Sequence, residues 1–467
     1  MKATFLTEDF LLHTDAAREL YHVYVENLPI IDYHNHLEPR ALATDQCYSD
    51  LAELWVTHDP YKHRAMRING IPEYSITGKA PSKEKYEVWA RTSPYVVGNP
   101  LYHWTALELK RIFNVDDLLA SDTTEEIYQH CNSLLQKEGY STIGILRKWN
   151  VEIVCTSDDL LDDVSLHRMA SEHVTDLKVL PSLRADSILA FGTPGFNAWL
   201  ERLRQVASIN SLEDYLYALR LRLDVFSEAG CRLADHALDN GFTFHLPNAD
   251  EASRIFTVCL QNGNMAATDK VKLISFVLFK LAQEYATRGW VMQLHIGAER
   301  FTTSRLRSLC GPAGGYATIG NVCDIRSLCD FLDSAESVGG MPKTILYTLN
   351  PADNAAFATL TGSFTGDGVA GKLQFGPAWW YNDHKEGIEN HLRTLSSYGL
   401  LSRFIGMTTD SRSILSFSRH EYFRRILCGY IGEQVEKGEF PNDMKLLGKI
   451  VENISYNNIY NWCFDRK

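Results

Sequence analysis

The sequence has no excess of basic residues and no long apolar run. Its 46 Lys and Arg stand against 58 Asp and Glu, which gives a formal charge of −12. Nucleic acids and anionic membranes favour clustered basic side chains, so this balance argues against both as partners. The most apolar helical segment, residues 271–282, contains Lys272 and Lys280 and is too short to cross a bilayer.

Closely spaced cysteines are also missing, and we expect no secretory leader. The ten cysteines include no C-x-x-C pair, and several occupy apolar periodic segments where a free thiol behaves as a small hydrophobic group. Glu8 and Asp9 lie where a secretory signal would need its apolar stretch. We therefore expect reduced cysteines and a cytoplasmic protein.

Short β-rich runs recur along the 467 residues at intervals that leave room for helices. The eight predicted strands cover residues 30–36, 151–156, 178–184, 242–246, 290–296, 344–349, 372–375 and 403–409. This alternation predicts an α/β fold, a distorted (β/α)8 TIM-type barrel that forms a single domain over residues 1–467. An open, doubly wound sheet is the alternative.

The spacing between the predicted strands is uneven in two places. Residues 37–150 are far longer than one crossover helix requires, and their pattern predicts a mainly helical insertion that caps the active site. A second helical insertion is predicted at 191–240, after the third strand. Long loops at the carboxyl ends of barrel strands usually build the substrate pocket.

Two histidines close the first predicted strand, and an aspartate follows the last. His34 and His36 are two residues apart, so they lie on one face of an extended chain. Barrel closure makes the first and eighth strands neighbours, which brings Asp410 to the same point. Two imidazoles and a carboxylate suit one divalent metal, with zinc preferred and manganese, iron or cobalt also compatible. The alternative role for Asp410 is a helix N-cap.

Polar residues also follow most of the other predicted strands. His295 is a candidate fourth metal ligand, a proton-handling residue or a hydrogen-bonded structural histidine. Arg184 and Arg412 suit a clamp for a carboxylate or hydroxyl, because the guanidinium fork matches a carboxylate. At the remaining strand ends, Asp158, Asp186 and His245 are equally well explained as solvated loop residues, whereas Asn350 follows the sixth predicted strand.

Several longer motifs resemble the uronate isomerases of the amidohydrolase superfamily. They are HNH at 34–36, RAMRINGIPE at 64–73, QLHIGAER at 293–300, ILYTLNPADN at 345–354, QFGPAWWYND at 374–383 and LSRFIGMTTDSRSILSFSRHEYFRRILC at 401–428. The resemblance covers nearly the whole chain. It implies a distorted barrel with one catalytic metal and the reversible conversion of D-glucuronate to D-fructuronate and of D-galacturonate to D-tagaturonate.

The resemblance also assigns roles to individual residues. The metal ligands would be His34, His36 and Asp410, and Asp410 would also serve as the catalytic base. The resemblance also implies catalytic roles for Tyr61 and Arg412 and a carboxylate-binding role for Arg184. We further expect His295 to take part in catalysis, and Arg64, Trp379 and Trp380 to bind the substrate. This chain has His63 where the family has a tryptophan, and the expected strand ends offer His245 and Asn350 in place of ligands for a second metal.

The implied enzyme is an intramolecular oxidoreductase, an aldose–ketose isomerase acting on a small uronate sugar. Proton transfer through a cis-enediol is the expected path, and a hydride shift is the competing chemistry. A metal-dependent amidohydrolase or deaminase is the second reading, and a non-catalytic carbohydrate-binding protein is the third. Whether the chain forms a homo-oligomer is left open by the sequence.

Overall fold

Parallel strands form the centre of the molecule. The computed structural model describes residues 5–239, 242–263 and 265–465, and within them the strands form two parallel sheets and one antiparallel pair. The first sheet has the order β1-β2-β4, the second the order β11-β10-β7-β6-β5-β3, and β8 pairs with β9. Their bounds are β1 Ile30–Asp32, β2 Val151–Cys155, β3 Asp158–Asp159, β4 Lys178–Leu180, β5 Leu183–Arg184, β6 Leu233–Leu238, β7 Val291–Ile296, β8 Ala298–Glu299, β9 Thr318–Ile319, β10 Lys343–Thr348 and β11 Leu373–Phe375.

The two parallel sheets continue into each other at short breaks in two strands. β2 leads into β3, and β4 leads into β5. Backbone hydrogen bonds span the breaks, from Thr156 N to the Leu180 carbonyl (3.1 Å) and from Asp158 N to the Ser182 carbonyl (2.9 Å). The expected α/β fold with parallel strands is therefore confirmed.

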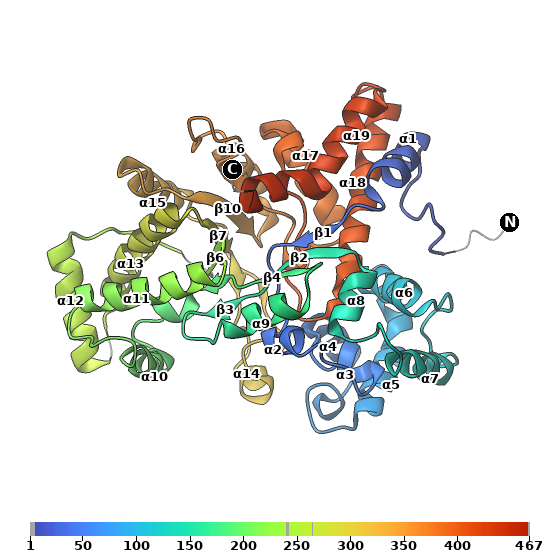
Figure 1. Cartoon of the computed structure of the whole chain (residues 1–467), viewed down its shortest axis with the longest axis horizontal. Coiled ribbons are helices and arrows are strands. Elements are labelled where there is room, and N and C mark those ends of the chain that lie inside the picture. The colour runs from blue at the N-terminus through green and yellow to red at the C-terminus, as the bar shows by residue number, and fades with distance from the viewer. Residues whose placement is uncertain (1–4, 240–241, 264, 466–467) are drawn as a thin grey trace.

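Helices gather on opposite sides of these strands (Figure 1). Helices α3 to α7 lie at one side, and α10 to α13 lie at the other, with the strands between them. The helix bounds are α1 Asp15–Glu19, α2 Pro39–Ala43, α3 Leu51–Trp55, α4 Pro60–Ile68, α5 Ser82–Thr92, α6 Pro100–Phe113, α7 Thr124–Leu135, α8 Thr142–Lys148, α9 Ser165–His173, α10 Pro194–Leu203, α11 Leu212–Glu228, α12 Ala249–Asn262, α13 Ala267–Arg288, α14 Ser304–Cys310, α15 Ile325–Ser337, α16 Asn354–Leu360, α17 Lys385–Tyr398, α18 Ser418–Glu436 and α19 Met444–Glu452.

The central strands are buried on both faces, as parallel sheets require. Every residue of β7 is buried, including Gln293 and His295. The Tyr347 hydroxyl on neighbouring β10 donates to Gln293 Oε1 at 2.7 Å, which satisfies one of these buried polar groups. Polar side chains inside otherwise apolar strands mark the part of the core where the site lies.

The predicted fourth strand is wrong. Residues 242–246 are irregular, and the strand that pairs with β5 and β7 is β6, at Leu233–Leu238. The segment 242–246 has the more regular apolar alternation, whereas β6 contains Asp235 and His236. Tertiary pairing outweighs local pattern here. The second predicted insertion therefore ends in a strand, and His245 does not lie at a strand end.

The predicted eighth strand is also wrong as a hydrogen-bonded strand. Residues 404–410 run beside β1, but side chains make several of the links that a β-ladder would make with its backbone. The Tyr33 hydroxyl donates to the Gly406 carbonyl at 2.9 Å, and His34 N donates to Thr408 Oγ1 at 2.8 Å. These bonds fix the segment against β1 without regular pairing.

Two further features of the structure concern the state of the cysteines and the apolar length of the helices. All ten cysteines are free thiols. Among the helices in the described residues, none combines the length and apolar character needed to cross a membrane.

Candidate active site and metal centre

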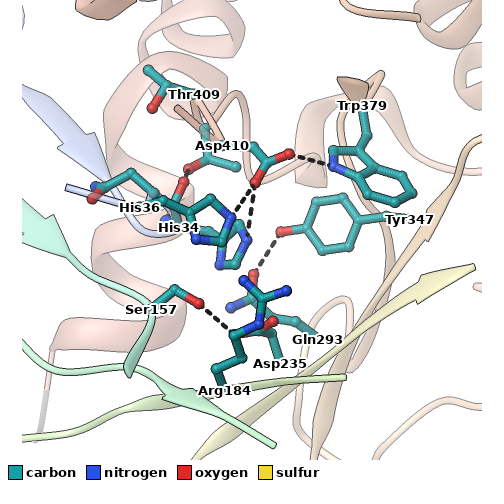
Figure 2. Close-up of polar contacts among 12 residues, drawn as sticks. His34, His36, Ser157, Arg184, Asp235, Gln293, Tyr347, Trp379, Thr409 and Asp410 are labelled. Carbon is teal, nitrogen blue, oxygen red and sulfur yellow. Dashed lines mark hydrogen bonds and ion pairs between the residues drawn. The ribbon is translucent and has the colours of Figure 1, made fainter. Parts of the chain in front are cut away.

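His34, His36 and Asp410 meet at one point, as expected from the sequence (Figure 2). Asp410 Oδ1 lies 2.9 Å from His36 Nε2 and 3.4 Å from His34 Nε2. The other carboxylate oxygen, Oδ2, accepts a hydrogen bond from Trp379 Nε1 at 2.7 Å. Both histidines therefore face the same carboxylate oxygen, and the tryptophan fixes the orientation of the carboxylate.

Backbone bonds hold the two ligand segments in register. Asp410 N donates to the His34 carbonyl at 3.0 Å, and His36 N donates to the Ser411 carbonyl at 2.8 Å. Asp410 has a φ of +48°, in the left-handed region that few residues other than glycine adopt. Such a conformation persists only where the surrounding structure imposes it, and it is common at functional sites.

The protonation states of two of the three groups, His36 and Asp410, suit a metal ion, whereas at His34 burial is outweighed by the carboxylates of Asp235 and Asp410, which raise its pKa. Burial lowers the pKa of His36 to about 4, so the ring is neutral near pH 7. Burial opposes ionisation of Asp410, but hydrogen bonds from His34 and His36 hold its pKa well below the usual range. Neutral imidazole and ionised carboxylate are the forms that bind divalent metals.

His34 belongs to a second group of possible ligands. His34, Asp235 and His295 are all buried, and each offers a ligand atom within 4.8 Å of the others. The rings of His34 and His295 lie 4.8 Å apart, and His295 stacks on Tyr347 with centroids 4.3 Å apart. Two ring nitrogens, His34 Nδ1 and His295 Nε2, are buried without a hydrogen-bond partner in the described residues. Buried polar atoms of this kind normally have a partner, so the donor set fits a bound group.

Asp235 is the main site residue that the sequence did not reveal, because β6 was misplaced. It lies opposite Arg184 in the β5–β6 register and accepts a hydrogen bond from Ser157 Oγ at 3.3 Å. Burial raises its pKa to about 6. Its only sequence signal was an Asp-His pair inside an apolar run.

Arg184 and Arg412 open to one cavity. This cavity has a volume of about 800 Å³, and His36 also lines it. Arg184 Nε donates to Asp186 Oδ2 at 2.8 Å, which orients the guanidinium and leaves its terminal nitrogens toward the histidines (Figure 2). The two arginines are thus placed where an anionic group beside His36 would meet them.

Tyr61, Arg64 and Trp380 line a different cavity of about 890 Å³. Tyr61 is the second residue of α4, whose N-terminus is capped by Asp59. Arg64 donates to the Ala317 carbonyl at 3.1 Å and lies over the Tyr381 ring. The structure therefore separates the predicted site residues into two cavities. Outside both linings lie Trp379, His34, His295 and Asp410.

Arg419 connects Tyr61 to the cluster. Its guanidinium lies 5.5 Å from the centre of the Tyr61 ring, pairs with Asp383 at 2.7 Å and donates to the Thr409 carbonyl. Burial raises the pKa of Tyr61, and Arg419 opposes that rise. Arg419 lies within the motif at 401–428, and no separate role for it was expected from the sequence.

The fold and the cluster define a class: an α/β protein with parallel strands and a candidate metal centre where β1 meets the segment before α18. The sequence profile of the glucuronate isomerase family matches residues 1–463, and the chain belongs to this family.

Individual relatives match over nearly their full length. The uronate isomerase of Haemophilus influenzae (strain PittGG) is 45% identical over 463 residues, 98% of this chain and 99% of the relative. That of Geobacillus thermodenitrificans is 46% identical over 458 residues, 97% of this chain and 98% of the relative. The crystal structure of the Thermotoga maritima uronate isomerase superposes with a TM-score of 0.92 at 32% identity, covering 98% of this chain and 100% of that one.

Proposed function

We propose that this chain interconverts D-glucuronate with D-fructuronate and D-galacturonate with D-tagaturonate. The family membership, near-full-length similarity to proteins named uronate isomerase, and a buried histidine–carboxylate cluster beside two arginines support this reaction. The observation that carries most weight is the placement of Arg184 and Arg412 on the cavity that His36 lines, because a uronate differs from other sugars by its carboxylate.

One divalent metal ion, preferably zinc, would be held by His34, His36 and Asp410. Two imidazole nitrogens and a carboxylate oxygen are a common zinc donor set, and three protein ligands leave positions for substrate. When bound, such an ion orders and polarises the oxygens of the substrate. The shared ligand His34 favours one ion over two at this centre.

The chemistry proposed is proton transfer through a cis-enediol. Asp410, which must be only weakly held at the metal centre when substrate arrives because a metal contact lowers its basicity, removes the proton from C2 and returns it to C1. Trp379 fixes the orientation of this carboxylate. Tyr61 moves protons between the hydroxyl oxygens, and Arg412 stabilises the oxygen on which negative charge develops. Arg184 holds the carboxylate at C6, and His295 contacts the substrate or completes the ligand set.

The architecture that we propose for this site is a distorted (β/α)8 barrel. Residues 404–411, fixed to β1 by side-chain and backbone bonds, would occupy the eighth strand position between β11 and β1. Residues 37–150 would cap the site within the single domain 1–467. We further propose a cytoplasmic enzyme that acts on a small sugar without nucleic acid or membrane, and a homo-oligomeric state is compatible with it.

The test is turnover of both uronates by the wild type and by Arg184→Met. We expect conversion of at least one aldose by the wild type and a loss of about 10- to 100-fold in kcat/KM in the variant, since a charged hydrogen bond contributes roughly 1.5–3 kcal/mol. Arg147→Met is the matched control, because Arg147 forms an exposed pair with Asp176. No conversion of either sugar by metal-loaded wild type would exclude the proposal.

A further inference from the structure

Asp32 lies at the junction of the two segments that carry the candidate metal ligands. It is fully buried, at 0% exposure, and ends β1 two residues before His34. Its Oδ1 accepts a hydrogen bond from Thr409 N at 2.7 Å, and its Oδ2 accepts one from Thr409 Oγ1 at 2.6 Å. Thr409 directly precedes Asp410, so one carboxylate joins the histidine segment to the aspartate segment.

Three further groups surround the same carboxylate. The Thr408 hydroxyl lies 2.8 Å from Asp32 Oδ1, and Asn35 Nδ2 lies 3.0 Å from Oδ2. His420 on α18 places Nε2 3.3 Å from Oδ1. A buried carboxylate is costly unless it is hydrogen-bonded, and here every nearby donor comes from residues beside the ligands or from the helix that follows them.

The same network bears on the strained backbone of Asp410. The left-handed φ of Asp410 follows directly after the residue whose amide and hydroxyl Asp32 fixes. The Thr409 carbonyl is fixed in addition by Arg419. Loss of the Asp32 bonds would allow the 408–410 segment to relax and would move Asp410 away from His34 and His36.

We propose that Asp32 is a positioning residue for the metal centre, setting the separation of Asp410 from His34 and His36 through Thr408 and Thr409. Asp32 touches neither the substrate nor the ligand atoms in this role. The inference rests on the proposed metal site and extends it to a residue outside the ligand set. Groups that orient metal ligands typically change metal affinity by 10–100-fold when removed.

The main test is the affinity of Asp32→Asn for Zn²⁺, measured by competition with a chelator. The amide keeps one acceptor oxygen but places an N–H donor where the second Thr409 donor needs an acceptor, so we expect affinity to fall 10–100-fold. The matched control is Asp353→Asn. Asp353 is also a buried carboxylate, 4% exposed, and accepts hydrogen bonds from Cys323 N and the Thr348 hydroxyl, outside the cluster. The Asp353→Asn variant should lose thermal stability and keep wild-type zinc affinity.

A milder pair of variants keeps the test decisive if Asp32→Asn does not fold. Thr409→Val removes only the hydroxyl bond to Asp32, and Thr409→Ser keeps a hydroxyl there. We expect weaker zinc binding in the first and recovery toward wild type in the second.

Wild-type zinc affinity in folded Thr409→Val, or an equal loss in Asp353→Asn, would overturn the proposal. Because zinc affinity is measured without turnover, failure of the isomerase assay and failure of this inference are separate results.

Discussion

Trp379 Nε1 donates to Asp410 Oδ2 at 2.7 Å, and the Trp379 ring also packs against His295 with centroids 4.7 Å apart. The tryptophan thus contacts both the carboxylate of the three-residue cluster and the histidine of the second ligand group. It approaches Asp410 on the oxygen that the two histidines do not face.

Replacement of Trp379 by phenylalanine should lower kcat by about 10-fold or more. The variant keeps an aromatic ring beside His295 but removes the donor to ionised Asp410, a bond worth roughly 1.5–3 kcal/mol. Steady-state kinetics on both uronates gives the measurement. Trp199→Phe is the control, because Trp199, in α10, makes the same type of bond: its Nε1 donates to Asp159 Oδ1 at 2.8 Å. An equal loss in both variants would refute a specific role for Trp379.

The sequence predicted the parts of this site that lie in recognisable patterns. His34 and His36 end an apolar run, and Asp410 follows another, so their meeting could be expected from the alternation of strands and helices. The exact register of residues 404–410 against β1 could not be predicted, because the side chains of Tyr33 and Thr408 replace backbone ladder bonds between these two segments. Such links carry no periodic signal in the sequence.

The site residues that could not be predicted from the sequence share one physical property. Asp235, Asp32 and Arg419 are charged groups inside the core, where hydrophobic patterning predicts apolar residues. Each is tolerated because tertiary neighbours supply hydrogen bonds or an opposite charge, and those neighbours are distant in sequence. The fourth strand was predicted at the wrong position for the same reason, since Asp235 and His236 interrupt the apolar run that would have identified β6.

Metal removal should lower both activity and stability. Chelation is expected to abolish turnover, and one equivalent of Zn²⁺ per chain should restore it. A ligand present at 100 times its Kd stabilises the folded state by about 2.7 kcal/mol, so the melting temperature should rise on loading.

Thermal unfolding of His36→Asn tests whether the stabilisation by zinc comes from binding at the proposed metal centre. The variant should show little rise in melting temperature with zinc, whereas exposed His13→Asn should behave like the wild type. Two tightly held ions per chain after dialysis would contradict the single-metal centre.

Isomerisation in D2O should place solvent deuterium at C1 of the ketose. Proton transfer passes the C2 proton to Asp410, where it exchanges with solvent to some extent before return. Mass spectrometry and proton NMR of the product measure the incorporation. With C2-deuterated aldose in ordinary water, part of the label should be lost. Complete transfer of the label to C1, together with no incorporation from D2O, would instead favour a hydride shift.

His63 should make the protein less stable in mild acid. The ring is 5% exposed and its Nε2 lies 2.9 Å from the Val56 carbonyl, and burial lowers its pKa to about 4. In the unfolded chain His63 has the ordinary histidine pKa of about 6.5. Between about pH 4 and pH 6.5 the unfolded chain therefore binds more protons than the folded protein. The stability that neutral His63 contributes is therefore complete above about pH 6.5 and is lost as the pH falls toward 4.

The matched variant is His63→Gln, which offers a donor to Val56 but does not titrate. Urea unfolding at pH 7 and at pH 4.5 should show a larger loss of unfolding free energy in the wild type, by up to about 3 kcal/mol. The carboxylates elsewhere titrate in both proteins, so their contribution cancels in the comparison. Equal losses in the two proteins would mean that the folded chain accommodates the imidazolium, for example through nearby Asp59, whose charge raises the pKa of His63.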